Sequence, residues 1–388
     1  MKKILAMLLA LVMVMGLVAC GGNAPETTAP AETNAPAEST PAVSDVEYKI
    51  AMITDYGDIT DQSFNQTTYE AVKAFAETNG VDYTYYKPQG DSTAERIAMV
   101  DAAVVDGYNV IVMPGFAFGE TLAEVADIYP EVKFIALDVA EGEGGFTATE
   151  NVFSAVYQEE LSGYMAGVAA VKLGYKHLGY LGGMAVPAVQ RFGYGFLQGV
   201  DAAAKELGIV GDIKVEYVYG NQFYGDADIT AVMDTWYGEK GVECVFACGG
   251  GIWSSAAEAA AKVGGKVIGV DVDQAAIIDG QYGEGMTVTS AMKGLAPTVN
   301  TLLTAIILED NWAAYAGKIE TLGLVSADPE ANYVQIPMAS TQFAEGFTAE
   351  DYSALVAAMF EGTVVVSGDI SAFPTTEVAV ETYADIKG

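Results

Sequence analysis

The sequence predicts an α/β fold with parallel sheets. Short apolar runs of strand length recur along the chain, and stretches with helical periodicity separate them. Most of these runs are hydrophobic throughout, which is typical of strands covered on both faces, as in a parallel sheet. Strands and helices that alternate at this spacing favour an α/β architecture.

The predicted strands fall into two groups, on either side of an acidic, glycine-rich stretch at 141–145. We interpret this stretch as a hinge between two domains. One large doubly wound domain with a surface loop there is the alternative that the length of the chain leaves open. The predicted strands are 49–54, 82–86, 110–113 and 133–137 in the first group, and 178–181, 214–219, 244–247 and 267–270 in the second.

Helices are predicted between these strands. The first begins after Ser63, which would cap it, and ends at Gly80. Val72, Phe75 and Ala76 would form its buried face. The other predicted helices are 159–173, 192–207, 227–237, 254–263 and 295–308.

The first residues carry a secretory signal. Lys2 and Lys3 precede an apolar run at 4–18, which is shorter than the roughly 20 residues that span a bilayer comfortably. The run ends in Leu-Val-Ala-Cys, and these residues resemble the lipobox of bacterial lipoproteins, which are cleaved before the cysteine and lipidated on it. We therefore expect a signal peptide at 1–19 and a lipid on Cys20, although an ordinary signal peptide is the alternative.

The segment at 20–46 is rich in proline, threonine and alanine and has almost no large apolar residue, so it predicts a disordered tether. The expected location is the extracytoplasmic face of the cell membrane. The formal net charge of −34 excludes electrostatic binding to nucleic acid or anionic lipid.

Cysteine and histidine are too sparse for most metal and nucleophile chemistry. On one strand Cys244 and Cys248 would lie about 13 Å apart, too far for a disulfide, so we expect two small buried residues. His177 is the single histidine, so a histidine metal cluster is excluded and a catalytic triad would depend on this one residue. We expect no cofactor and no metal.

Unusual residues follow the predicted strands, where ligands bind in open α/β sheets. They are carboxylates, aromatic rings and glycines, which suit a neutral, flat, hydroxylated solute such as a nucleoside or a sugar. An anion would be repelled. Each residue alone has a plainer role, as a helix cap, a core side chain or a turn. The set includes Asp55, Phe64, Asn65, Phe116, Asp138, Phe223, Gly249, Trp253 and Asp271.

Several motifs, in order, resemble the basic membrane protein (PnrA-like) family of lipoproteins, the substrate-binding components of nucleoside ABC importers. The motifs are Asp-Gln-Ser-Phe-Asn-Gln from 61, Leu-Gly-Tyr-Leu-Gly-Gly-Met from 178, Arg-Phe-Gly-Tyr-Gly-Phe from 191, Val-Asp-Val-Asp-Gln from 270 and Thr-Ser-Ala-Met-Lys from 289. The resemblance implies a type I periplasmic-binding-protein fold, with two doubly wound parallel-sheet lobes joined by three crossings. The first lobe would comprise 47–140 and 276–316, and the second 141–275 and 317–388.

The resemblance also implies roles for single residues. Family members clamp a purine nucleoside between two rings, which by position are Phe64 and Phe223, with Tyr224 as the alternative to Phe223. The residues implied to bind the base edge are Asp55, Asn65 and Asp138, and those implied to bind the ribose are Asp271 and Lys293. Trp253 stands where members often have a smaller residue.

The function expected from these features is a monomeric receptor that closes on a nucleoside and delivers it to an ABC permease, without catalysis. A receptor for ribose or galactose on the same fold is the main alternative. A dinucleotide-dependent oxidoreductase is disfavoured because Gly182-Gly183-Met184 lacks the full glycine spacing of such sites. A sensing receptor or adhesin without a transporter remains a further possibility.

Overall fold

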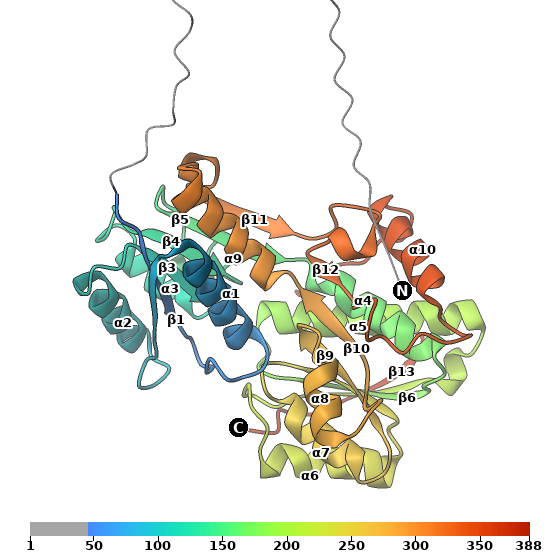
Figure 1. Ribbon diagram of the computed structural model, residues 1–388. Coiled ribbons are helices and arrows are strands. Elements are labelled where there is room, and N and C mark those ends of the chain that lie inside the picture. Colours follow the sequence, from blue (N-terminus) through green and yellow to red (C-terminus); the bar gives the residue numbers. More distant parts are fainter. Residues whose placement is uncertain (1–45) are drawn as a thin grey trace, which may run out of the picture. The chain divides into compact units, whose positions relative to one another are not determined.

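A computed structural model describes residues 46–388, which form two lobes, each built on one sheet (Figure 1). The predicted signal, Cys20 and nearly all of the tether lie outside the described residues. The sheet of the first lobe is parallel throughout, in the order β11-β5-β4-β3-β1-β2. Its strands are β1 (Lys49–Ile53), β2 (Asp82–Tyr86), β3 (Val110–Pro114), β4 (Lys133–Leu137), β5 (Val152–Tyr157) and β11 (Lys318–Leu322).

The sheet of the second lobe has the order β12-β10-β9-β8-β6-β7-β13. Only β12 runs antiparallel to its neighbour among these described strands. The strands are β6 (His177–Gly182), β7 (Lys214–Tyr219), β8 (Cys244–Cys248), β9 (Lys266–Asp271), β10 (Thr287–Lys293), β12 (Val334–Gln335) and β13 (Ala379–Thr382).

Helices cover both faces of each sheet. In the first lobe these are α1 (Phe64–Asn79), α2 (Thr93–Val105), α3 (Phe118–Val125) and α9 (Leu295–Leu303). In the second they are α4 (Glu159–Lys172), α5 (Pro187–Leu207), α6 (Ala227–Asp234), α7 (Trp253–Ala261), α8 (Ala275–Tyr282) and α10 (Ala349–Phe360). Short π-helical turns at Thr235–Lys240 and Thr304–Leu308 continue α6 and α9. The 3-10 turns are Glu143–Gly145, Val210–Asp212, Trp312–Ala314 and Pro329–Ala331.

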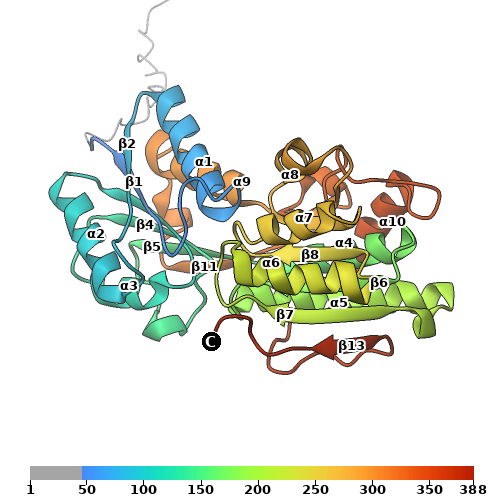
Figure 2. The same ribbon diagram turned by 90° about the horizontal axis from the view of Figure 1, so that it is seen from below.

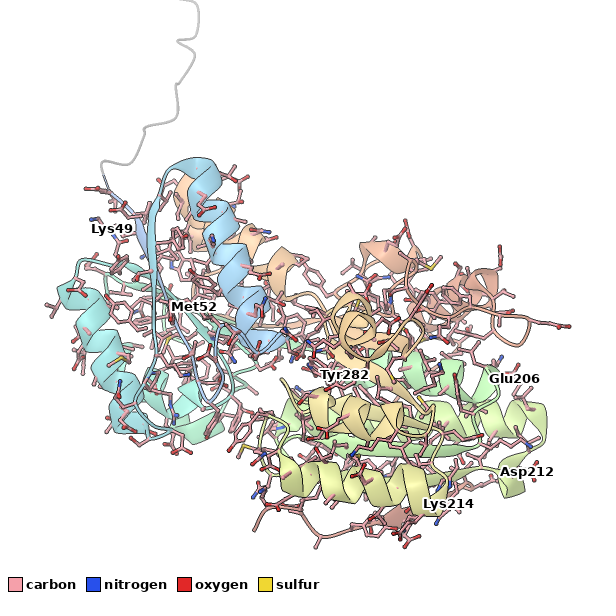
Figure 3. All side chains as sticks on the ribbon, turned by 60° about the horizontal axis from the view of Figure 1, so that its bottom comes forward. Lys49, Met52, Glu206, Asp212, Lys214 and Tyr282 are labelled. Atoms are coloured by element: carbon pink, nitrogen blue, oxygen red, sulfur yellow. The ribbon has the colours of Figure 1, made fainter. Side chains whose placement is uncertain are left out.

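Strand β1 shows why its sequence reads as continuously apolar. Ile50 and Met52 pack in a core cluster with α1 and α9, whereas Ala51 and Ile53 pack in another with α2 and α3. Successive side chains of a strand point to opposite faces, so a strand covered on both faces needs apolar residues at every position. Figure 3 shows Met52 inside the first lobe, while Lys49 lies at its periphery and Glu206, Asp212 and Lys214 lie at that of the second.

The fold class and the predicted strands are confirmed, but the domain boundaries differ from the expected ones. The first lobe also contains β5 and β11, and the second contains β10. The chain therefore crosses near residue 158, after Lys293 and after Leu322. The glycine-rich stretch at 141–145 is not the hinge: it forms a turn against α3, where the backbone of Glu143 lies so close to Gly119 that a Cβ there would be 2.5 Å from the Glu143 oxygen.

Helices α4 and α5 of the second lobe approach each other unusually closely. A Cβ at Gly163 of α4 would lie 2.2 Å from the carbonyl oxygen of Phe192, and a Cβ at Gly195 of α5 would lie 2.1 Å from that of Glu160. Glycine on both helices is what permits this backbone contact. It brings the first turn of α4 against α5 at the edge of the cavity described next.

No helix within residues 46–388 has the length and apolar character needed to cross a membrane.

Candidate functional site

A cavity of about 980 Å³ lies at the carboxyl ends of strands from both sheets, where the lobes face each other. Both lobes contribute to it. All of the predicted site residues line it: Asp55, Phe64, Asn65, Phe116 and Asp138 from the first lobe, and Phe223, Gly249, Trp253, Asp271 and Lys293 from the second.

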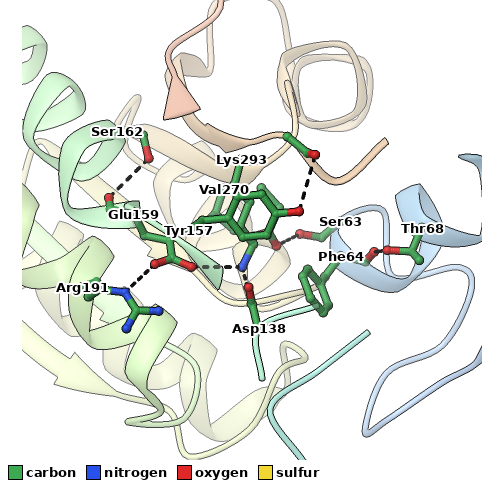
Figure 4. A network of polar contacts seen from close by, with 12 residues as sticks. Ser63, Phe64, Thr68, Asp138, Tyr157, Glu159, Ser162, Arg191, Val270 and Lys293 are labelled. Atoms are coloured by element: carbon green, nitrogen blue, oxygen red, sulfur yellow. Dashed lines mark hydrogen bonds and ion pairs between the residues drawn. The ribbon is translucent and has the colours of Figure 1, made fainter. Parts of the chain in front are cut away.

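Lys293 is the central cation of the site (Figure 4). Its side chain is 3% exposed, its Nζ pairs with Asp138, and the same atom lies 3.7 Å from carboxylate oxygens of both Glu159 and Asp271. Nζ also lies 4.5 Å from the centre of the Phe64 ring, within the range of a cation–π contact. Burial alone would lower the pKa of Lys293, but Asp138, Asp271 and Glu159 raise it above its ordinary value, so the lysine stays charged.

Two of these carboxylates are placed by matching backbone turns in the two lobes. Asp138 directly follows β4 with φ 63°, and Asp271 ends β9 with φ 66°. Aspartate tolerates this left-handed conformation better than most residues. Lys293 at the end of β10 therefore meets one such aspartate from each lobe.

Direct hydrogen bonds also join the lobes at the start of α1. The Ser63 hydroxyl donates to Asp271 Oδ2 at 2.6 Å, and Gln274 Nε2 donates to the Gln62 carbonyl oxygen at 3.0 Å. The prediction that Ser63 caps α1 is thus wrong for its side chain. Asp61 takes that role, because its carboxylate accepts from the amides of Ser63, Asn65 and Gln66.

Glu159 and Arg191 extend the network behind Lys293, and reasoning from the sequence missed both. Arg191 Nε donates to Glu159 Oε2 at 2.6 Å, and the glutamate side chain is fully buried. Burial raises the pKa of Glu159, while Arg191 and Lys293 oppose that rise. The close contact of α4 and α5 places Glu159 beside Arg191. No single motif in the sequence indicates this contact between the helices.

The Asp55 carboxylate lies between Asn65 and Gly115 at the cavity. Its Oδ1 accepts hydrogen bonds from the Gly57 amide at 3.1 Å and from Asn65 Nδ2 at 3.2 Å. Its Oδ2 lies over Gly115, where a Cβ would come within 2.0 Å of it, so glycine there makes room for the carboxylate. Burial raises the pKa of Asp55 to about 6. Asn65 Oδ1 is buried without a hydrogen-bond partner among the described residues.

Aromatic rings from both lobes meet at the cavity. Tyr56, which the sequence analysis missed although it directly follows Asp55, stacks on Phe116 with ring centres 5.8 Å apart and an angle of 20° between planes. The Tyr56 ring centre also lies 6.3 Å from that of Phe223 in the other lobe. Tyr224 borders the cavity but is 61% exposed, so Phe223 is the ring that pairs across the lobes.

Glycines fit Phe223 closely against the second lobe. A Cβ at Gly183 would lie 2.5 Å from the Phe223 ring, and Gly249 has φ 151°, a conformation that L side chains rarely adopt. Trp253 is 3% exposed beside them, and its indole nitrogen has no hydrogen-bond partner among the described residues.

The charge of the cavity lining is negative. Its lysines are Lys87, which pairs with Asp58, and Lys293, which is committed to the network above. The lining also contains carboxylates that have no lysine partner, such as those of Asp55 and Asp61. The lining therefore favours a neutral ligand over an anion.

The single histidine and the two cysteines of the described residues lie in the second lobe, away from the cavity lining except for Cys248. His177 at the start of β6 contacts Glu216 at 2.9 Å, and Cys244 and Cys248 are buried and free, as predicted. Across residues 46–388, no group of three or more histidine, cysteine, aspartate or glutamate side chains is arranged to hold a metal ion.

Over residues 48–327 the sequence matches the family described as ABC transporter substrate-binding protein PnrA-like. The chain belongs to this family. The resemblance stated from the motifs is thereby confirmed, and the PnrA-like family is one of binding proteins for ABC transporters.

Relatives of this PnrA-like chain include the ABC transporter nucleoside-binding protein BmpA of Lactococcus lactis subsp. cremoris, which is 30% identical over 241 residues, 59% of this chain and 65% of that protein. An uncharacterized lipoprotein of Pyrococcus abyssi is 26% identical over 226 residues, 57% of this chain and 50% of that one. Among solved structures, an ABC transporter solute-binding protein from Aeropyrum pernix K1 has a TM-score of 0.64 at 24% identity, over 82% of this chain and 87% of that one. This likeness shows the fold, the type I architecture expected from the motifs.

Proposed function

We propose that this chain is a lipid-anchored, extracytoplasmic receptor that captures a purine nucleoside between its lobes and delivers it to an ABC permease. One observation carries the proposal: the cavity combines aromatic rings from both lobes with buried oxygens of Asn65 and Asp138 that have no hydrogen-bond partner among the described residues, while its lysines are already paired. The name of the Lactococcus relative supports a nucleoside as the ligand.

In the proposed complex, Phe64 and Phe223 stack on the two faces of the base. Asp55 Oδ2 accepts a hydrogen bond from the base edge, and Asn65 offers its unpartnered Oδ1. Asp271 and Lys293 hold the ribose hydroxyls. Binding favours the closed arrangement because the ligand contacts both lobes only when they are together.

The proposed anchor is Cys20. A flexible tether of this length reaches roughly 30 Å, enough to keep the receptor near a permease in the same membrane. The Pyrococcus relative is named a lipoprotein, which supports the same anchoring. Mass spectrometry of the protein extracted from its native membrane would detect the lipid on Cys20.

Isothermal titration calorimetry tests the ligand class, with inosine, guanosine, adenosine, ribose, galactose and inosine monophosphate. We expect binding heat from purine nucleosides and weak or no heat from the monophosphate, which the negative lining repels. Heat from ribose or galactose without the nucleosides would favour the sugar receptor instead. Release of free base during the titration, detected by chromatography, would indicate an enzyme.

Replacing Phe223 with alanine is expected to weaken inosine binding about 10- to 100-fold, since stacking of a base on a ring is worth about 1–3 kcal/mol. Tyr224→Ala is the matched control, because the neighbouring ring is mostly exposed, and we expect less than about a twofold change from a side chain outside the bound stack. Equal losses from both changes, measured by calorimetry, would contradict the assignment of Phe223 as the second ring.

Binding of inosine is expected to weaken as the pH falls through about 6, the pKa to which burial raises Asp55. Above that pH the carboxylate is ionised, and Oδ2 accepts a hydrogen bond from a ring N–H. Below it the group carries a proton, and affinity falls toward a limit of about tenfold per pH unit. Asp55→Asn should bind more weakly and lose this pH dependence, so an unchanged profile in that variant would show that another group titrates.

A further inference from the structure

The segment that follows β13 runs along the edge of the second lobe toward the first lobe (Figure 2). Residues 379–382 pair in parallel with β7, and the Tyr383 and Ile386 amides continue the pairing by donating to the carbonyl oxygens of Tyr217 and Tyr219. The Ile386 contact has a length of 2.9 Å. This segment lies beyond the 48–327 range of the family match.

Lys387 follows directly, at the base of the loop that carries Phe223, which we call the Phe223 loop (residues 220–226). Its Nζ lies 2.8 Å from Asp226 Oδ2 and also pairs with Asp228. Its carbonyl oxygen accepts a hydrogen bond from Asn221 Nδ2 at 3.1 Å. Lys387 thus holds both ends of the loop, Asn221 and Asp226.

Asp226 connects this lysine to the interior of the loop. Its Oδ1 caps α6 by accepting from the Asp228 and Ile229 amides, and its Oδ2 accepts from Gln222 Nε2 at 3.1 Å. Although burial opposes the charged form, hydrogen bonds from Lys387 and from the Ile229 amide hold the pKa of Asp226 at about 2. The ion pair is therefore present across the physiological pH range.

Between these two ends, the loop is fixed against the rest of the lobe by its backbone. The Asn221 amide donates to the Gly183 carbonyl oxygen at 2.9 Å, and the Phe223 carbonyl oxygen accepts from the Gly251 amide at 2.8 Å. Asn221 has φ 58°, a left-handed conformation that costs free energy unless surrounding contacts hold it. The hydrogen bond from Asn221 Nδ2 to the backbone carbonyl oxygen of Lys387 is one such contact, and the ion pair of Lys387 Nζ with Asp226 keeps that carbonyl beside the loop.

We propose that Lys387 is a positioning residue for ligand binding: by joining Asn221 to Asp226 it holds the Phe223 ring in place at the cavity. The proposal rests on the proposed function for its ligand, but the positioning itself is a property of the empty protein. Lys387 itself does not line the cavity.

The test compares full-length Lys387→Met with Lys262→Met, a matched change on the same lobe. Lys262 is also a half-exposed lysine that pairs with two carboxylates, those of Asp234 and Glu258, but it contacts neither the loop nor the main cavity. We expect Lys387→Met to weaken inosine binding about three- to tenfold, and Lys262→Met to change it less than about twofold, because exposed ion pairs contribute little by themselves. Lys387→Arg should restore most of the affinity.

A double-mutant cycle separates positioning from general loss of stability. In a Phe223→Ala background, Lys387→Met should have no further effect on the dissociation constant, since the ring it holds is gone. The proposal would be overturned if Lys387→Met weakened inosine binding equally in the wild type and in the Phe223→Ala variant. It would also be overturned if Lys387→Met did not weaken binding in the wild type.

Hydrogen exchange in the unliganded protein tests positioning without a ligand. Lys387→Met should speed exchange of the Gly251 and Asn221 amides by about three- to tenfold, whereas Lys262→Met should leave both unchanged. If no nucleoside binds the wild type, the proposed function fails, yet this exchange result still decides the positioning. Unchanged exchange in Lys387→Met would overturn it.

Discussion

Replacing Lys293 with methionine is expected to lower the free energy of unfolding by about 3–5 kcal/mol, the usual cost of leaving buried carboxylates without their partner. Asp138, Asp271 and Glu159 all face this lysine, and its side chain is 3% exposed. Methionine matches its length but brings no charge. Arg191 would still compensate the charge of Glu159. The uncompensated charges in the variant would therefore be mainly those of the two aspartates. Thermal unfolding monitored by circular dichroism measures the effect.

The same variant should also lose detectable nucleoside binding, because it removes the proposed ribose contact and the cation above Phe64. Lys262→Met is the control, and no measurable loss of stability is expected from this exposed pair. Adding Asp138→Asn to Lys293→Met should recover part of the stability, since it removes one uncompensated charge. A Lys293 variant as stable as the Lys262 variant would contradict this account of the network.

Replacing Glu160 with glutamine is expected to stabilise the protein at pH 8 by about 3 kcal/mol, at about 1.4 kcal/mol per unit of pKa shift. Glu160 is 5% exposed in the first turn of α4, and its Oε2 has no hydrogen-bond partner among the described residues. Burial raises its pKa to about 7. The glutamine keeps the shape of the side chain without the charge.

The sign of the pH dependence follows from proton binding. Between about pH 4.5 and 7 the folded protein holds a proton on Glu160 that the unfolded chain has released, so the wild type loses stability as the pH rises through this window. Glu160→Gln should lack that part of the decline, and its advantage over the wild type should therefore vanish near pH 4. Exposed Glu361→Gln is the control. Parallel stability curves for the wild type and Glu160→Gln, from thermal melts at several pH values, would disprove the prediction.

Apolar runs in the sequence predicted eight of the thirteen described strands, because many central strands carry their burial in their composition, but β5 was missed although it is apolar as well. The strand β1 is apolar at nearly every position, so it was predicted almost to the residue. β10 was missed because Thr287–Lys293 contains threonine, serine and lysine, residues that a buried strand takes only when their polar groups find partners. Such partners are set by tertiary contacts, for example Thr289 with Thr341.

The boundaries between lobes were misplaced for a related reason. Glycine and acidic residues at 141–145 are typical of a flexible connection, but the same residues form a tight turn when a helix offers a close surface, as α3 does.

The candidate site was more predictable, since the carboxyl ends of parallel strands meet at one edge of a sheet by geometry alone. Glu159 and Arg191 could not be found in this way, because the contact of α4 with α5 brings them together. Tyr56 does follow a strand, but only its stacking on Phe116 marks it as a site residue.

Lys293 ends β10 and stands immediately before the chain crosses to α9 in the first lobe. The cation therefore lies at a pivot, and when domains rotate about a hinge the atoms near the axis move least. A small rotation of the lobes about this point would therefore change the distances from Lys293 to Asp138 and Asp271 little. Opening of the lobes would then break the Ser63–Asp271 and Gln274–Gln62 hydrogen bonds, and the ligand's contacts with both lobes would favour the closed state in addition to these bonds.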